Sequence, residues 1–121
     1  ARLVTRHFEQ ALRPVGLTAG QFNLLSIIGA MEPTTLPAIA DAMAMDRTTL
    51  NRNIKPLIKS QIIECWGGAG RRPTSAKLTT KGHLVLAESS GLWRQAQTDL
   101  TALLGAAKAG QLIDILPTIR P

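Results

Sequence analysis

Apolar side chains recur along most of the chain with the spacing of α-helices that bury one face. The first such stretch covers residues 1–13 and ends at Pro14, which cannot continue a helix. A second begins at Thr18, where the run TAGQ has the form of a capping box. The run TTLPAIADAM starts a third, shorter helix with Pro37 in its first turn. The pattern therefore predicts three helices before Asp46.

Residues 46–61, DRTTLNRNIKPLIKSQ, predict a fourth helix that Asp46 caps. One side of it is an apolar stripe, formed by Leu50, Ile54, Leu57 and Ile58. Arg52 lies about 200° around the helix from Leu50, on the opposite side. That side holds basic and hydroxyl groups and no carboxylate: Thr48, Thr49, Arg52, Lys55 and Lys59. A helix face kept only for solubility usually mixes both signs of charge, so this face is a candidate binding surface.

The periodicity changes after the fourth helix. β-branched and aromatic residues predict a strand at 62–66, and a second short strand follows at 76–78. Glycines and a proline between them predict a loop, so the two strands form a hairpin. A threonine at 79–80 then caps a long helix that runs to about Leu104, where a glycine-containing segment ends it. A last helical segment covers residues 111–119.

Positive charge is concentrated in one part of the chain. Residues 46–82 carry eight Lys and Arg side chains against Asp46 and Glu64, so this segment holds the whole net charge of +6. Residues 1–45 and 83–121 are each neutral. A local basic field of this kind is typical of a site for a polyanion, although a solvated basic face with no partner is the simpler alternative.

A short helix packed on a polar helix, followed by a hairpin with a basic glycine-rich tip, is the order of a winged helix-turn-helix. We therefore predict a mainly α fold with a small β-hairpin wing. The winged helix-turn-helix would occupy residues 18–82. Segments 1–17 and 83–121 would form a helical dimerisation region, because a helix with an unburied apolar stripe usually finds a partner.

An α-helix fits the major groove of B-DNA, and its N-terminal half reaches the base edges. We expect contacts in the major groove from Thr48, Thr49, Asn51, Arg52 and Lys55. Phosphate or wing contacts would come from Arg47, Lys59, Arg71 and Arg72, and Lys55 is far enough along the helix to meet a phosphate as well. Arg52 is central, because a bidentate bond to guanine O6 and N7 gives roughly 1–3 kcal/mol of discrimination.

The runs GLTAGQFNLLSII, LPAIADAMAMDRTTLNRNIKPLIKSQIIE and KLTTKG resemble the MarR family of bacterial and archaeal transcription regulators. The resemblance covers most of the chain. It implies a homodimer with interlocked first and last helices that reads a palindromic operator, and a repressor released by a small molecule or an oxidant. The wing of the family usually has an Asp two residues before an Arg that enters the minor groove. Arg72 matches that Arg, but Gly70 replaces the Asp that would orient it.

Other residues offer less specific chemistry. His7 and His83 have no partners at metal-ligand spacing, so we expect structural roles for both and no metal or cofactor. The single cysteine, Cys65, cannot form an internal disulfide, which suits the cytoplasm, and we expect an ordinary strand cysteine rather than a redox sensor. Paired carboxylates, a nucleophile elbow and a phosphate loop are missing from the sequence, so we do not expect an enzyme.

The sequence has no apolar run long enough for a membrane span, and we expect no signal peptide. Its start at Ala1, without Met, is consistent with native residues before it. Two alternatives to a DNA-binding regulator stay open. One is a small RNA-binding protein, although aromatic residues make up only 3% of the chain and there is no Tyr to stack on bases. The other is a winged helix used for protein contacts, which the concentrated positive charge disfavours.

Overall fold

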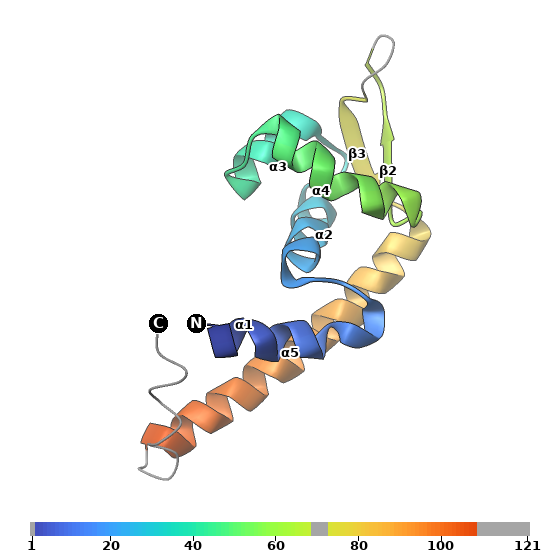
Figure 1. Ribbon diagram of the computed structural model, residues 1–121. Helices are drawn as coiled ribbons and strands as arrows, with labels where there is room; N and C mark the ends of the chain where they lie inside the picture. The colour runs from blue at the N-terminus through green and yellow to red at the C-terminus, as the bar shows by residue number, and fades with distance from the viewer. Residues whose placement is uncertain (1, 69–72, 109–121) are drawn as a thin grey trace. The chain divides into compact units, whose positions relative to one another are not determined.

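The computed structural model describes residues 2–68 and 73–108 (Figure 1). The chain divides into two compact units. One is Gly20–Ala87, and the other is formed by the chain up to Ala19 and from Glu88 onward. The elements are α1 (Arg2–Ala11), the 3-10 helix η1 (Arg13–Val15), α2 (Ala19–Met31), β1 (Thr34–Thr35), α3 (Leu36–Met43), α4 (Arg47–Lys59), β2 (Ile63–Trp66), β3 (Ser75–Leu78) and α5 (Thr80–Lys108). The mainly α, winged helix-turn-helix fold predicted from the sequence is confirmed.

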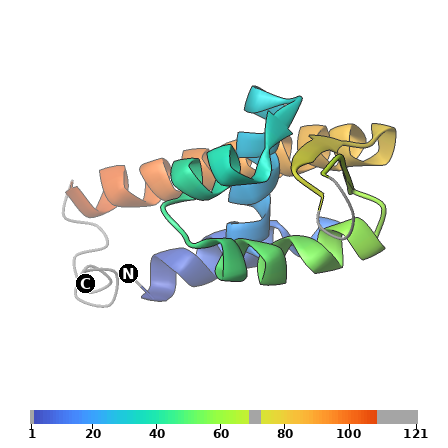
Figure 2. The ribbon, with the colours of Figure 1, turned by 90° about the horizontal axis from the view of Figure 1, so that it is seen from above.

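Local capping defines the helix-turn-helix. The Thr35 hydroxyl accepts the Ala38 N–H at 3.2 Å and begins α3. The helix is followed by its C-cap residue Ala44, which is in the left-handed conformation with φ 54°. The Asp46 carboxylate then accepts the Thr49 N–H at 2.7 Å and begins α4, as predicted. Figure 2 shows α3 and α4 next to each other, joined by this turn. Signals within a few residues of each other therefore specify the whole motif.

A single apolar core holds the unit Gly20–Ala87 together. Leu25 and Ile28 of α2 and Leu50 of α4 have no exposed surface. The other buried apolar side chains of this unit are Phe22, Leu24, Leu36, Ile39, Ala40, Ile54, Leu57, Ile62, Ile63, Ala76 and Leu78. Burial of apolar surface contributes about 25 cal/mol per Å². It fixes the rotation of α4, so the polar side of this helix has a defined direction.

The wing is a three-stranded antiparallel sheet in the order β1-β3-β2. The hairpin predicted from the sequence is its β2–β3 pair, in which Cys65 lies opposite Ala76 and Glu64 lies opposite Lys77. The prediction missed β1, where Thr34 pairs with Ala76. Two residues are too few to show a strand periodicity, so this strand is defined only by its partner.

Three local predictions are wrong. Ile58 is 38% exposed, although it was placed in the buried stripe of α4. The long helix predicted to end at Gly105 continues through it, because a single glycine costs only about 1 kcal/mol in a helix. The first helix ends at Ala11, and Pro14 lies inside η1 instead of following a longer helix. The predicted last helix, residues 111–119, lies outside the described residues.

The other unit is built from α1 and the part of α5 from Glu88 onward. The ring of Phe8 lies 4.2 Å from that of Trp93, measured between centroids. The His7 Nε2 atom lies 2.9 Å from the carbonyl oxygen of Ala96, a hydrogen bond that agrees with the structural role expected for this histidine. These contacts join α1 to α5 side by side.

Candidate nucleic-acid interface

The helix α4 carries seven of the nine residues that the sequence nominated as DNA contacts. Four of them are exposed: Thr48, Arg52, Lys55 and Lys59. Three are half-buried: Arg47, Thr49 and Asn51. The remaining two, Arg71 and Arg72, lie outside the described residues. The structure therefore brings the helical candidates together on the polar side of one helix.

Arg52 stands opposite the anchored side of α4. The anchor consists of Leu50, Ile54 and Leu57, which are 0%, 3% and 2% exposed. The N-cap residue Asp46 carries an acidic group at the start of α4. Its pKa lies below the usual value, mainly because its carboxylate accepts a hydrogen bond from the Thr49 backbone N–H and also because of the positive charge of Arg52. The Asp46 carboxylate thus stays ionised and engaged in the cap at the start of α4.

A hollow of about 320 Å³ lies between α4 and the wing. Leu36 of α3, Cys65 of β2 and Pro73 contribute to its walls. The lining side chains of α4 are Arg47, Asn51, Ile54, Lys55 and Ile58. No carboxylate is among the described residues that line it. Ile58 is exposed because it faces this hollow and not the core.

The polar side of α4 consequently has two rows. Arg47, Asn51 and Lys55 repeat at every fourth position and line the hollow; we call them the wing-facing row. Thr48, Arg52 and Lys59 are exposed and, at about 100° per residue, cluster on the side opposite Leu50. We call these three the outward row. The helical pattern alone could not separate the two rows, because the separation depends on where the wing lies.

Arg47 has an unusual environment. Its Nε atom is buried and has no hydrogen-bond partner among the described residues. Leaving a buried donor unpaired costs about 1–3 kcal/mol, and such groups are rare in native structures. Other atoms of the Arg47 side chain line the hollow beside the wing.

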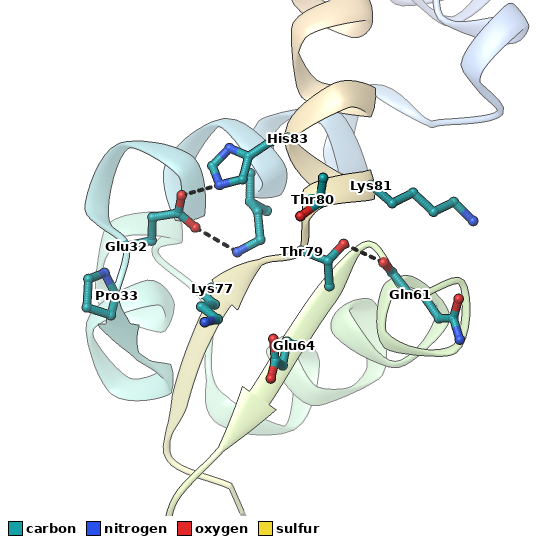
Figure 3. Close-up of a pocket in the computed structure, with 10 residues that line it drawn as sticks. Glu32, Pro33, Gln61, Glu64, Lys77, Thr79, Thr80, Lys81 and His83 are labelled. Carbon is teal, nitrogen blue, oxygen red and sulfur yellow. Dashed lines mark hydrogen bonds and ion pairs between the residues drawn. The ribbon is translucent and has the colours of Figure 1, made fainter.

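The base of the wing is held by a residue that sequence reasoning missed, Glu32 at the end of α2 (Figure 3). Its Oε2 atom accepts the Leu78 N–H at 2.7 Å, and its Oε1 atom lies 2.5 Å from the His83 Nε2 atom. Nearby, the Thr79 hydroxyl donates to the Gln61 carbonyl oxygen. Because Glu32 and Leu78 are 46 residues apart, no local pattern could reveal this contact.

A second hollow, of about 850 Å³, surrounds these contacts of Glu32 with Leu78 and His83. Its lining includes Glu32, Glu64, Lys77 and Lys81, together with the imidazole of His83. Both signs of charge are present, so this hollow has no preference for a polyanion. The hollow beside α4 differs, since its charged lining residues are Arg47 and Lys55 only, within the described chain.

Cys65 is held in a protonated form. Burial, and then the charge of Glu64, raise the pKa of its thiol, which makes it a poor nucleophile at neutral pH. Within residues 2–68 and 73–108, no group of three or more His, Cys, Asp and Glu side chains could hold a metal ion. No helix in the same part of the chain is long and apolar enough to cross a membrane.

Comparison with known proteins gives a family match that spans the helix-turn-helix. The MarR family profile matches residues 17–64, from just before α2 into β2. No curated protein is recognisably similar to the chain in sequence.

Solved structures are similar over almost the whole chain. The transcriptional regulator MosR of M. tuberculosis is 30% identical, with a TM-score of 0.70 over 98% of this chain and 87% of its own. Its complex with DNA gives 29% identity and a TM-score of 0.72, over 99% and 92%. The reduced form of MarR from E. coli gives 26% and 0.75, over 99% and 90%. The transcriptional repressor CouR, bound to a 23-mer DNA duplex, gives 27% and 0.77, over 96% and 83%.

Proposed function

Since the chain belongs to the MarR family, we propose that it is a sequence-specific, double-stranded DNA-binding transcription regulator. The observation that carries this proposal is the outward row of α4. Two cations and a hydroxyl stand on the exposed side of a helix whose opposite side is fully anchored in the core. Solved structures of MosR and CouR, both similar to this chain, contain DNA.

In the proposed complex, α4 lies in the major groove. The Arg52 guanidinium donates two parallel hydrogen bonds to guanine O6 and N7, and Thr48 and Thr49 contact neighbouring bases or thymine methyl groups. Lys59, further along the helix, meets a phosphate. Arg71 and Arg72 would add phosphate or minor-groove contacts from the wing. The core fixes the direction of α4, so the protein binds without reorganising its reading helix.

We also propose that the regulator is a homodimer that recognises a palindromic operator. A hollow of about 240 Å³ between α1 and α5 is lined mainly by apolar residues, among them Leu3, Val4, Leu100 and Leu103. Leu3 is 39% exposed and Leu104 is 40% exposed. A second copy would cover this surface and would supply a second α4 for the other half-site.

Release by a signal completes the proposal, with the regulator acting as a repressor. The similar protein CouR is described as a transcriptional repressor. The release signal could be a small molecule or an oxidant, and the environment of Cys65 favours a small molecule. A raised pKa leaves little thiolate at neutral pH, and the thiolate is the form that oxidants attack.

A competition assay tests the proposal against its two alternatives. The full chain is titrated against labelled duplex DNA, single-stranded RNA of equal length and heparin at two salt concentrations, with fluorescence anisotropy as the readout. Duplexes enriched by in vitro selection should bind more tightly than random duplexes and RNA. Equal or tighter binding to RNA would support an RNA-binding module. A chain that binds no nucleic acid would support a protein-interaction module.

A further inference from the structure

We propose that Glu32, the residue directly after α2, is a positioning residue that holds the wing in the orientation in which it binds DNA. The inference rests on the proposed DNA binding and names a residue on which that binding depends without touching the duplex. Glu32 would act only through its contacts with β3 and α5, so its replacement should change the contribution of the wing and leave base reading by α4 intact.

The register of the sheet explains why a carboxylate is needed at this position. Thr34 of β1 pairs with Ala76 of β3, so the antiparallel ladder would next bring residue 32 opposite Leu78. β1 has only two residues, however, and the backbone N–H of Glu32 still bonds to the Ile28 carbonyl oxygen of α2 at 2.9 Å. The Glu32 Oε2 atom accepts the Leu78 N–H at 2.7 Å instead. A side chain therefore supplies the acceptor that this strand cannot supply from its backbone.

The second carboxylate oxygen of Glu32 joins the same group to α5. Its Oε1 atom lies 2.5 Å from the His83 Nε2 atom, and Figure 3 shows both contacts of the carboxylate. The Glu32 side chain is 19% exposed, against 53% for His83. Hydrogen bonds to an ionised group are stronger than neutral ones, and shielding from water strengthens them further. Glu32 thus holds the end of β3 and the start of α5 through one rigid group.

A separate set of contacts fixes the end of β3 to the turn between α4 and β2. The Thr79 N–H donates to the Ile62 carbonyl oxygen at 3.0 Å, and the Thr79 hydroxyl accepts the Gly82 N–H at 2.9 Å. Without Glu32, the hairpin would keep this anchor and lose the one on its β1 side. The expected consequence is a wing that pivots about Thr79 in a chain that still folds.

A pivoting wing should bind DNA more weakly because the apparent affinity falls with the fraction of molecules in the binding orientation. An orientation that is fixed before binding avoids this loss. The reading helix α4 does not depend on Glu32, since Leu50, Ile54 and Leu57 anchor it in the core. Sequence preference should therefore survive the replacement of Glu32.

The test compares Glu32→Ala with Glu32→Gln in the full chain, on a selected duplex and a random duplex. Gln keeps an oxygen for the Leu78 N–H and an amide that can donate to His83, whereas Ala removes both. Glu32→Ala should weaken binding to both duplexes by about three- to tenfold per subunit and keep their ratio within about twofold. Glu32→Gln should bind like the wild type. Glu32→Asp, one methylene too short for both contacts, is a second disruptive variant and should resemble Glu32→Ala.

The matched control for charge is Glu64→Gln. Glu64 is exposed on β2 and lines the same hollow as Glu32, so its replacement also removes one negative charge there. It leaves the Leu78 N–H bonded to Glu32. Glu64→Gln should not weaken DNA binding. An equal loss in Glu64→Gln and Glu32→Ala would overturn the inference, because the effect would then follow charge and not position.

Combined variants show whether Glu32 acts through the wing. In a chain that carries Arg71→Ala and Arg72→Ala, Glu32→Ala should cause no further loss of affinity, because the contacts that it positions are gone. Combined with Arg52→Ala, the two losses should add, since different elements carry them. Additive losses with the wing arginines would overturn the inference.

Trp66 of β2 reports on the wing in the absence of DNA. The chain has two tryptophans, and Trp93→Phe leaves Trp66, which is 39% exposed and has the Lys77 Nζ atom 5.6 Å from its ring centroid. In that background Glu32→Ala should change acrylamide quenching of Trp66 with far-UV circular dichroism unchanged, and Glu32→Gln should restore it. Wild-type affinity in Glu32→Ala, or an equal loss in Glu32→Gln, would overturn the inference. A wild type that binds no duplex would instead overturn the proposed function.

Discussion

The winged-helix unit and the α1–α5 unit offer opposite kinds of surface. The segment 46–82, inside the winged-helix unit, holds the whole charge surplus of +6. The α1–α5 unit instead leaves Leu3 and Leu104 about 40% exposed, and an apolar hollow lies between its helices. Charge attracts any polyanion over roughly 8–10 Å at physiological salt, whereas apolar contact requires a partner of matching shape. The first surface suits a long nucleic acid and the second suits one defined partner.

Raising the salt concentration should weaken DNA binding at the basic surface but leave dimerisation unchanged, and this difference should be larger than the effect of any mutation. Several cations per subunit, doubled in a dimer, imply a slope of log K for duplex DNA against log salt of roughly −5 to −9. Raising salt from 50 to 200 mM should then weaken DNA binding by roughly 10³- to 10⁵-fold. Sedimentation of the free protein over the same range should show an unchanged dimer. A DNA slope near zero would remove the basic segment as the contact surface.

A charge placed in the apolar hollow between α1 and α5 should prevent dimerisation without changing the basic surface of the winged-helix unit. Leu103 lines that hollow and is half-buried in one chain. In Leu103→Asp, a carboxylate would have to be buried without a partner in the dimer, which costs several kcal/mol. Sedimentation at micromolar concentration should give a monomer. The control is Met31→Asp, because Met31 is 38% exposed in the winged-helix unit and lies outside the residues expected to form the dimerisation region. If Leu103→Asp stays dimeric, the dimer forms through another surface.

Two glycines of α5 should respond in opposite directions. A Cβ at Gly82 would lie 2.1 Å from the Ile62 carbonyl oxygen, so Gly82→Ala must displace backbone in the winged-helix unit. We expect a loss of about 1–3 kcal/mol in the free energy of unfolding. At Gly91 a Cβ meets open space in the described chain, and Gly91→Ala should gain about 0.5–1 kcal/mol of helix stability. Urea unfolding at equal protein concentration measures both, and equal effects would contradict the close approach at Gly82.

The smallest effect concerns the cap of α4. Hydrogen bonding from Thr49 lowers the pKa of Asp46, so the folded state favours the carboxylate. This stabilisation is complete above the ordinary Asp pKa and is lost as the pH falls through the lowered one. Asp46→Asn keeps a side-chain oxygen for the cap but does not titrate. The difference in free energy of unfolding between wild type and variant should therefore shrink in acid. A constant difference would mean that Asp46 titrates normally.

Much of the fold could be predicted because its signals are local. The Asp46 cap and the buried Leu50 follow from spacing within one or two helical turns. Contacts between distant segments could not be predicted. The Glu9 carboxylate, for example, accepts the Ala19 N–H at the start of α2 at 3.1 and 3.2 Å. Such bonds depend on how the elements pack against each other, and local patterns in a single sequence do not reveal that packing.

The candidate site shows the same division. A helical wheel is enough to place Arg52 opposite the core, and the structure has it exposed there. The separate orientation of Arg47 and Asn51 depends on where β2 runs after α4 ends, which is a tertiary property. The exposure of Ile58 has the same cause.

The most direct test of the central claim, that α4 reads DNA sequence through Arg52 of its outward row, is the selected-to-random affinity ratio of Arg52→Ala. Fluorescence anisotropy at fixed salt measures it for the full chain, with Lys59→Ala as the control from the same row. Arg52→Ala should lose about 1–3 kcal/mol of discrimination at one base position per half-site, while random binding falls much less. Lys59→Ala should weaken both DNAs alike. If Arg52→Ala weakens selected and random duplexes equally, the bases are read by another element.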